Sequence, residues 1–345
     1  MKLVDWLIIG AGPAGIATVG KLIDNGVPAN QIAWLDPVFN VGDLGNKWFN
    51  VSSNTSVELF LKFLHESPAF AFANCPEAYY LQHLPMDATC ELKWVVEPLR
   101  WVTARLSETV QPIRGIAHRL WLTHRQWHIQ LDNEVICAKQ VVMAIGALPK
   151  IIPYPAPSMI PLESALNLER LPLACGPSDT VAVFGSSHSA VIAIRHLLAC
   201  GVQKIINFHR GALRYAVPMD NWTLFDNTGL KGDTARWARA VLDGDCPESI
   251  LRFWASHENI EQYLPECTKI IYSIGFTRRQ LPVTGLDVLS YDDKCGIIAP
   301  GLFGCGIAFP ESIVDPFGHV EANVGLWKFM TYLTKVVPVW LKYGA

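Results

Sequence analysis

Apolar and polar positions alternate along the chain in a way that predicts strands and helices in turn. Residues 4–9 form an apolar run typical of a buried strand, residues 14–25 read as a helix, and residues 31–35 form a second apolar run. The same order returns between residues 181 and 208. Strand, helix and strand in this sequence indicate parallel strands joined by crossover helices. The pattern therefore predicts an α/β protein with two parallel sheets.

The remaining pattern completes a two-domain organisation. Short apolar runs predict an antiparallel excursion from the first sheet, with strands over 116–122, 127–131, 135–138 and 140–145. Further elements are predicted as helices over 235–242, 248–257 and 322–336 and as a strand over 267–274. Four prolines between residues 149 and 157 mark a domain boundary. We expect a first domain of residues 1–150 completed by residues 278–345, with a second domain of residues 151–277 inserted between them.

Composition and charge narrow the classes of function. The 345 residues include 28 Lys and Arg against 31 Asp and Glu, a net charge of −3, and no basic run that would indicate nucleic-acid binding. No uninterrupted apolar run reaches the length of an integral membrane segment. The nine cysteines are odd in number and include no Cys-x-x-Cys pair, which predicts reduced thiols in a cytoplasmic protein. His118, His124 and His128 lack the spacing of metal ligands, so we expect no metal site.

The turn between the first strand and the first helix carries the most specific signal. Its Gly-x-Gly-x-x-Gly spacing permits a tight turn, the close approach of a pyrophosphate, and close packing of helix on sheet. Asp36 ends the next strand twenty-one positions after Gly15, where an acidic side chain would accept hydrogen bonds from an adenosine ribose. These features predict a dinucleotide site with candidate binding residues Gly10, Gly12, Pro13, Ala14, Gly15 and Asp36.

A second turn of the same type follows the apolar strand at residues 181–184. Its middle glycine is replaced by Ser187, which makes the signal weaker, and its candidate binding residues are Gly185, Ser187, Ser189 and Ala190. Arg210 stands where the first domain has its acidic residue, and a guanidinium there would suit the 2′-phosphate of NADPH rather than NADH. The alternative is that Arg210 is an arginine on an exposed loop.

Two further segments are candidates for the pocket of the cofactor's reactive ring. Trp48 and Asn54 lie in a stretch rich in turn-forming and polar residues just after the first dinucleotide unit. The alternative for residues 52–56 is that they only cap the helix that follows. Near the end of the chain, Gly306 and Ile307 precede a predicted terminal helix and would offer its N-terminus to a cofactor.

Taken together, the two turns resemble those of the two-dinucleotide-binding-domain FAD/NAD(P)H oxidoreductase superfamily. Besides the first turn and its Asp36, the strand end that contains Ile145 and Gly146 and the segment 274–276 are similar to the two crossovers of that superfamily. The resemblance implies two Rossmann-like domains, with FAD bound by residues 1–150 plus 278–345 and NAD(P)H bound by residues 151–277. It also places Ile145 and Gly146 among the cofactor-binding residues.

Within the superfamily the motifs are most similar to those of flavin-containing monooxygenases. Thioredoxin reductase-like members carry a redox Cys-x-x-Cys and a Gly-Asp pair near the C-terminus, and this chain has neither. Gly306 and Ile307, with Gly318 and Glu321 downstream, instead resemble the monooxygenase pattern.

A second monooxygenase motif concerns the candidate catalytic residue. Residues 53–56 resemble the Thr-Asn-x-Ser segment of that family, whose asparagine, carried to Asn54, steadies a flavin hydroperoxide. The Phe-x-Gly-x-x-x-His motif of these monooxygenases is missing, because residues 160–167 read differently.

The expected function is an FAD-dependent oxidoreductase that uses NADPH or NADH as hydride donor and acts as a monooxygenase on a small molecule. One alternative is a reductase that passes electrons to a quinone or a small redox protein. Another is a non-catalytic flavin-binding sensor. The apolar C-terminal segment 335–341 is too short to span a bilayer. It is expected to be part of a packed terminal helix, and the alternatives are a homodimer contact or a peripheral membrane anchor.

Overall fold

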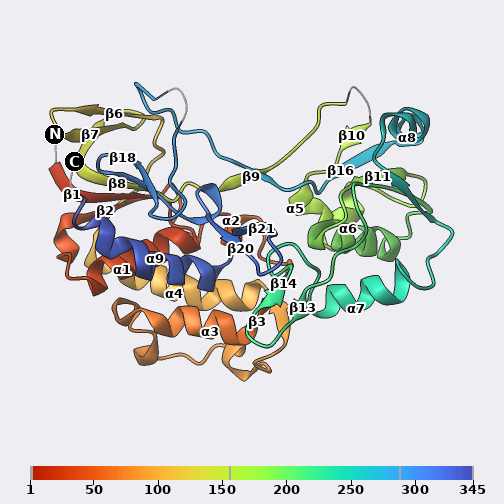
Figure 1. Cartoon of the computed structure of the whole chain (residues 1–345), viewed down its shortest axis with the longest axis horizontal. Helices are drawn as coiled ribbons and strands as arrows, with labels where there is room; N and C mark the ends of the chain where they lie inside the picture. The colour runs from red at the N-terminus through yellow and green to blue at the C-terminus, as the bar shows by residue number, and fades with distance from the viewer. Residues whose placement is uncertain (1–2, 155–156, 287–288, 344–345) are drawn as a thin grey trace. The chain divides into compact units, whose positions relative to one another are not determined.

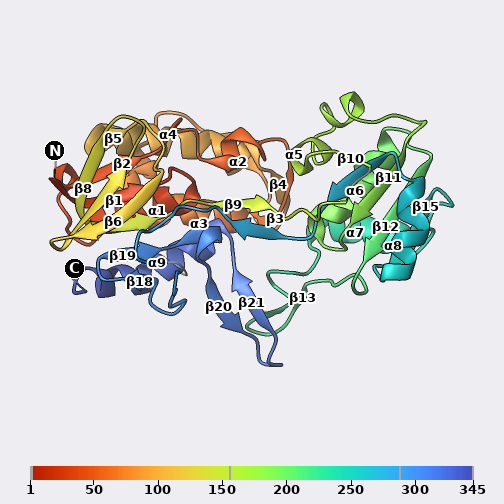
Figure 2. The same ribbon diagram turned by 90° about the horizontal axis from the view of Figure 1, so that it is seen from above.

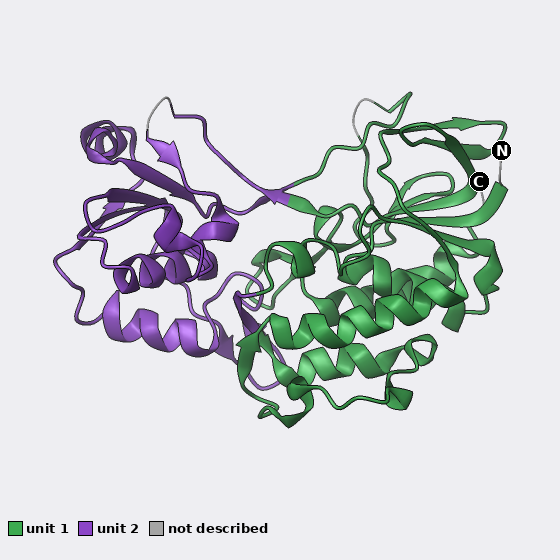
Figure 3. Ribbon diagram, turned by 180° about the vertical axis from the view of Figure 1, so that it is seen from behind, with its two compact units in different colours: residues 1–49, 55–147, 278–345 green, residues 50–54, 148–277 purple. Residues whose placement is uncertain are grey.

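The computed structural model describes residues 3–154, 157–286 and 289–343. The chain divides into two compact units (Figure 3). Unit 1 consists of Met1–Phe49, Thr55–Ala147 and Arg278–Ala345, and unit 2 consists of Asn50–Asn54 and Leu148–Thr277. Residues 50–54 thus fall in unit 2, whereas the sequence pattern predicts them in the first domain. Which cofactor each unit binds stays a prediction.

The main sheet of unit 1 has the strand order β18-β19-β8-β1-β2-β5. These strands are Ile297–Ala299, Leu302–Gly304, Val135–Met143, Leu3–Ile9, Ile32–Leu35 and Gln111–Ile113, in that order. Strand β1 pairs in parallel with β2 and β8, so that Ile9 lies opposite both Leu35 and Met143. Because parallel strands end at the same edge of a sheet, the residues that follow Ile9, Leu35 and Met143 are brought together there.

Strands β6 (Arg119–Thr123) and β7 (Gln126–Gln130) form the expected antiparallel excursion, in which β6 pairs with β7 and β7 pairs with β8. The prediction of two strands over 135–138 and 140–145 was wrong, because β8 runs without a break through both. It pairs with β1 over residues 137–143, with β7 over residues 135–138 and with β19 over residues 141–143, so one long strand serves three neighbours.

The side chains of β1 alternate between two cores, as a strand buried on both faces requires. Trp6 and Ile8 belong to the core under the helices that cover one face of the sheet in Figure 1. Leu7 and Ile9 belong to the core on the other face, which also contains side chains of β7. The covering helices are α1 (Pro13–Asp24), α3 (Val57–Glu66), α4 (Lys93–Thr109) and α9 (Leu326–Trp340). No helix in the described ranges is long and apolar enough to cross a bilayer.

The start of the terminal helix differs from the prediction. Residues 322–325 do not belong to α9, because Val320–Asn323 forms strand β21, which pairs in antiparallel fashion with β20 (Glu311–Val314) (Figure 2). Gly325, with φ of 153°, then separates the hairpin from the helix. The apolar residues at 320–324 therefore continue a strand pattern rather than a helical one.

Unit 2 is built on a second parallel sheet, with the order β10-β16-β11-β12-β15. These strands are Ser158–Met159, Lys269–Tyr272, Thr180–Phe184, Lys204–His209 and Ile250–Trp254. The helices of this unit are α5 (Leu162–Ala165), α6 (His188–Ala199), α7 (Gly232–Val241) and α8 (His257–Tyr263). Helix α6 follows β11 and leads to β12, which repeats the arrangement of β1, α1 and β2 in unit 1.

The predicted helix over 248–257 was wrong, because residues 250–254 form strand β15 beside β12. Ile250, Phe253 and Trp254 are β-branched or aromatic, the side chains that favour strands, and pairing with β12 decides between the two structures. Helix α8 begins only after Ser256, whose side chain accepts a hydrogen bond of 3.2 Å from the Asn259 backbone N–H.

Candidate functional site

The first glycine turn joins the carboxyl end of β1 to α1, and two of its glycines are required by the fold. Gly10 has φ of +109°, and a β-carbon there would lie 2.4 Å from the carbonyl oxygen of Ala144. A β-carbon at Gly15 would lie 1.9 Å from the carbonyl oxygen of Gly10. Both positions exclude any side chain, because the backbone on either side leaves no room.

Gly12 is different, because the atoms of the protein do not require a glycine there. It is the N-cap of α1 with φ of −77°, which any residue adopts, and a β-carbon would lie 3.9 Å from the nearest atom, Cα of Gly42. Pro13 follows at the first helical position, and Ala14 is buried. The missing side chain therefore keeps space open at the N-terminus of a twelve-residue helix, where backbone N–H groups attract an anion.

Asp36 fixes the turn from the adjacent strand. Its carboxylate is nearly buried and accepts hydrogen bonds from the backbone N–H groups of Ala11 at 2.8 Å, Val38 at 2.9 Å and Phe39 at 2.7 Å. A carboxylate has about four acceptor positions, so one remains for a further donor such as a ribose hydroxyl. The structure thus assigns Asp36 a role in holding the turn, and its ribose contact stays a prediction.

Sequence reasoning missed the loop that follows Asp36. Phe39 and Val41 have φ of 58° and 59°, in the left-handed region that a β-branched residue such as Val41 rarely adopts. Gly42, also at φ of 59°, packs so closely on the first turn that a β-carbon would lie 2.8 Å from Cα of Gly12. Strain of this kind concentrates at ligand sites. No periodicity could have revealed it, since the contact is between segments thirty residues apart.

Other predicted residues reach the same edge of the sheet through β8 and β19. Ile145 and Gly146 follow β8, and Gly146 accepts a hydrogen bond of 3.2 Å from the Arg279 backbone N–H. Gly306 follows β19 and lies so near α1 that its β-carbon would be 2.6 Å from Cβ of Ala14. The expectation that Gly306 and Ile307 open the terminal helix was wrong. They form a single 3-10 turn ahead of the β20–β21 hairpin.

The two candidates for the ring pocket fall in different units. Trp48 is half-buried in unit 1, just after the short helix α2 (Asp43–Asn46). Asn54 is half-buried in the part of strand β3 (Ser52–Ser56) that belongs to unit 2. Residues 52–56 therefore form a strand and do more than cap the helix that follows.

The second glycine turn repeats the first only in part. Gly185 has φ of +123°, and a β-carbon there would lie 2.1 Å from the carbonyl oxygen of Ser273. Ser187 is the N-cap of α6 but makes no capping side-chain bond within the described helix, and it is exposed. Ser189 is half-buried at the second helical position, and Ala190 is fully buried.

The end of β12 carries two basic residues beside this turn. Arg210 is exposed at the first position after the strand. The ring of His209 lies edge-on to Trp254 at a centroid distance of 6.0 Å. Its Nδ1 is buried without a hydrogen-bond partner among the described residues. Burial, with the nearby Arg252 guanidinium, lowers the pKa of His209, which keeps this ring neutral.

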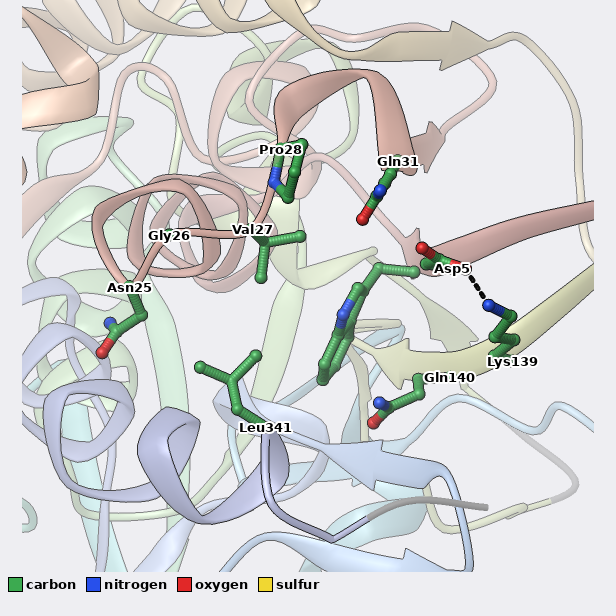
Figure 4. Close-up of a pocket in the computed structure, with 10 residues that line it drawn as sticks. Asp5, Asn25, Gly26, Val27, Pro28, Gln31, Lys139, Gln140 and Leu341 are labelled. Carbon is green, nitrogen blue, oxygen red and sulfur yellow. Dashed lines mark ion pairs between the residues drawn. The ribbon is translucent and has the colours of Figure 1, made fainter.

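A cavity of about 360 Å³ lies in unit 1, away from both turns (Figure 4). Asp5 and Lys139, which form an ion pair of 2.7 Å, line it together with Gln140 and Leu341. It also contacts residues 25–28, which follow the C-terminal end of α1, and therefore lies at the opposite end of that helix from the first turn. The convergence of glycine turn, Asp36 and Gly306, rather than this cavity, marks the candidate site.

Comparisons with known proteins show the family and the fold of the chain. No family model matches the chain. Monooxygenase AgnR1 of Paecilomyces divaricatus is 33% identical to it over 97% of both proteins. The chain belongs to the family of this monooxygenase. The resemblance to monooxygenases that the motifs suggested is thereby confirmed.

Solved structures show that the fold of this monooxygenase family member is shared more widely. A flavin-containing monooxygenase of Stenotrophomonas maltophilia matches with a TM-score of 0.65 at 15% identity, covering 99% of each chain. A thioredoxin reductase of Lactococcus lactis matches with a TM-score of 0.61 at 14% identity, covering 99% of this chain and 98% of that one. The predicted α/β fold with two Rossmann-like domains is confirmed, and the protein is an oxidoreductase for which these relatives imply FAD and NAD(P)H.

Proposed function

We propose that this protein is an FAD-dependent monooxygenase that takes hydride from NADPH and oxygenates a small molecule. The observation that carries the proposal is the open space at Gly12, which the fold does not need and which a pyrophosphate at the N-terminus of α1 would fill. Membership of a monooxygenase family gives the class of reaction.

The residues of unit 1 fit FAD. Gly10, Gly12, Pro13, Ala14 and Gly15 would hold its pyrophosphate, and Asp36 its adenosine ribose. Ile145, Gly146, Trp48, Gly306 and Ile307 would lie along the rest of the cofactor toward its ring. When bound, FAD supplies the redox chemistry, so the protein has to bind, orient and shield rather than provide strong acids or bases.

The residues of unit 2 fit a nicotinamide dinucleotide. Gly185, Ser187, Ser189 and Ala190 would hold its pyrophosphate, because the exposed Ser187 hydroxyl is not used to cap α6. Arg210 would bind the 2′-phosphate of NADPH, since its guanidinium is exposed at the end of β12, where the adenosine ribose lies in this fold. A phosphate bound by arginine gains charge-assisted hydrogen bonds that NADH does not offer.

Asn54 is the proposed catalytic residue. Its amide would be a hydrogen-bond donor in the pocket of the flavin ring, where the cofactor would supply the oxygen chemistry and the protein must exclude water. Replacing Asn54 with Ala should leave the anaerobic rate of flavin reduction by NADPH within about twofold. It should raise the hydrogen peroxide released per NADPH oxidised.

The matched control is Asn50→Ala, in the same five-residue segment of unit 2. It should leave peroxide release near that of the unchanged protein. If Asn54→Ala does not alter peroxide release either, Asn54 has no part in oxygen transfer.

A reductase that passes electrons to a quinone or a small redox protein remains the second candidate. It is favoured by the missing Phe-x-Gly-x-x-x-His motif at residues 160–167, where the structure has the short helix α5. Fast quinone reduction with no oxygen incorporated into any product would support it. Absence of flavin bleaching by NADPH would instead support a non-catalytic sensor.

We further propose a cytoplasmic location and a homodimer. All nine cysteines are free, which suits a reducing compartment. The dimer would use the C-terminal segment, where Val339 and Leu341 are exposed. Light scattering of Val339→Glu against the unchanged protein tests the dimer, which predicts a halved mass for the variant.

A further inference from the structure

Residues 50–54 are a short segment of unit 2 set between two segments of unit 1. The strand β3 begins in this segment and carries Asn54. Strand β3 pairs with β4 (Thr89–Glu91), and residues 50–54 also contact the rest of unit 2. One such contact comes from His188, the first residue of helix α6.

The hydrogen bond from His188 fixes which ring nitrogen carries the proton. Nε2 of His188 lies 3.3 Å from the carbonyl oxygen of Ser52. A carbonyl oxygen only accepts, so Nε2 must donate, and Nδ1 of the neutral ring is left without a hydrogen. His188 stands inside the second glycine turn, between Ser187 and Ser189. The bond therefore connects that turn to the strand that carries Asn54.

The rest of the ring's environment shows what holds it in place. Nδ1 is buried without a hydrogen-bond partner among the described residues. Burial lowers the pKa of His188, the ammonium of Lys231 lowers it further, and the Ser52 carbonyl opposes both effects. Lys231 is itself paired with Asp226 at 2.5 Å. The ring is thus neutral. Of its two nitrogens, Nε2 is bonded to the carbonyl oxygen of Ser52, and Nδ1 has no hydrogen-bond partner among the described residues.

We propose that His188 is a positioning residue that fixes the strand carrying Asn54 to the second glycine turn. The proposal rests on the function proposed above, in which that turn binds NADPH and Asn54 acts on oxygen. His188 then makes the catalytic amide part of the nucleotide-binding unit. It acts through Ser52 and touches no reacting atom.

Two variants that differ by one methylene separate this role from general stability. The amide nitrogen of His188→Gln can occupy the place of Nε2 and still donate to Ser52. The amide of His188→Asn is too short to reach the carbonyl. Hydrogen exchange of FAD-loaded protein should show the backbone amides of residues 51–54 exchanging about tenfold faster in His188→Asn, and within about twofold of normal in His188→Gln.

Activity provides the second measurement. His188→Asn should release more hydrogen peroxide per NADPH oxidised when NADPH is saturating, so that any change in nucleotide affinity does not affect the comparison. His188→Gln should restore normal coupling. The matched control is His196→Asn on the same helix, where Nδ1 lies 3.2 Å from the carbonyl oxygen of Ala165. It should change neither exchange at residues 51–54 nor peroxide release.

The outcomes distinguish this inference from the proposed function. Normal exchange at residues 51–54 in His188→Asn overturns it. So does normal peroxide release in His188→Asn when Asn54→Ala does release peroxide. If Asn54→Ala has no effect, the proposed function fails, while faster exchange in His188→Asn still supports the connection to Ser52.

Discussion

The two glycine turns end corresponding strands of the two units, and their first positions are alike. Gly10 and Gly185 both have positive φ, and in both a β-carbon would collide with a carbonyl oxygen that follows the neighbouring strand, Ala144 in one unit and Ser273 in the other. In both units, too, a side chain of the next strand donates to the carbonyl oxygen of this glycine. The donors are Trp34 at 2.9 Å and Asn207 at 2.8 Å.

The turns differ at their other two positions, and the difference separates what the fold requires from what a ligand requires. The third position is Gly15 in unit 1, where no side chain fits, and Ala190 in unit 2, which is buried and accommodated. The middle position is extended in both, at φ of −77° for Gly12 and −91° for Ser187. The backbone therefore does not explain why Gly12 lacks a side chain.

The largest effect should come from the third position. Gly15→Ala places a methyl group against the Gly10 carbonyl and should lower the free energy of unfolding by about 3 kcal/mol, because α1 must move away from the sheet. Ala190→Gly only adds a glycine to a helix and should cost about 1 kcal/mol. Urea unfolding of both variants measures the difference, and equal costs would contradict the comparison.

A substitution at the middle position should separate an effect on FAD binding from an effect on the stability of the fold. Gly12→Ala meets no protein atom closer than 3.9 Å, so the free energy of unfolding of the apoprotein should change by less than about 0.5 kcal/mol. FAD affinity should fall tenfold or more, by roughly 1–3 kcal/mol, because the methyl group enters the space kept for the pyrophosphate. Fluorescence titration of apoprotein with FAD is the measurement. An unchanged dissociation constant would show that the space at Gly12 serves no ligand.

Arg210, at the end of β12, offers a test with a smaller expected effect. Arg210→Gln should raise KM for NADPH by about tenfold and leave KM for NADH unchanged, since only the 2′-phosphate loses a charge-assisted contact. Steady-state kinetics with both nucleotides measure this. Arg236→Gln, at a side chain that is 74% exposed on α7, is the control and should change neither value. An equal rise in KM for both nucleotides would mean that Arg210 does not bind the 2′-phosphate.

The smallest effect concerns acid stability. Burial lowers the pKa values of His188, His196 and His209, all in unit 2. Their folded-state pKa values lie below those of the unfolded chain, so their contribution is complete above about pH 6.5 and is lost as the pH falls below it. Hydrogen exchange at pH 7.5 and pH 5.5 should show a larger loss of protection in unit 2 than in unit 1. Equal losses would exclude these histidines as the cause.

Local spacing explains why much of the site could be predicted from the sequence. Gly10, Gly12, Gly15 and Asp36 lie within one strand-helix-strand unit, so their relative positions follow from element lengths alone. The same reasoning placed Gly185 and Arg210 at the ends of β11 and β12. Their contacts with cofactors stay predictions.

What could not be predicted depends on contacts between distant segments. The run 250–254 reads equally well as helix or strand until β12 is there to pair with it. The left-handed conformation of Val41 has no local signal, because it is imposed by packing against Gly12 through Gly42. The place of residues 50–54 in unit 2 likewise follows from contacts such as that with His188, far along the chain.

The interrupted course of the chain has a consequence for engineering. Unit 2 is assembled from two separate stretches, so excising residues 148–277 alone would remove the carbonyl on which His188 depends. A chimera that borrows this unit from a homologous enzyme must transplant the short upstream stretch as well. Changing the specificity for the nicotinamide nucleotide therefore requires residues 50–54 and 148–277 to be exchanged together.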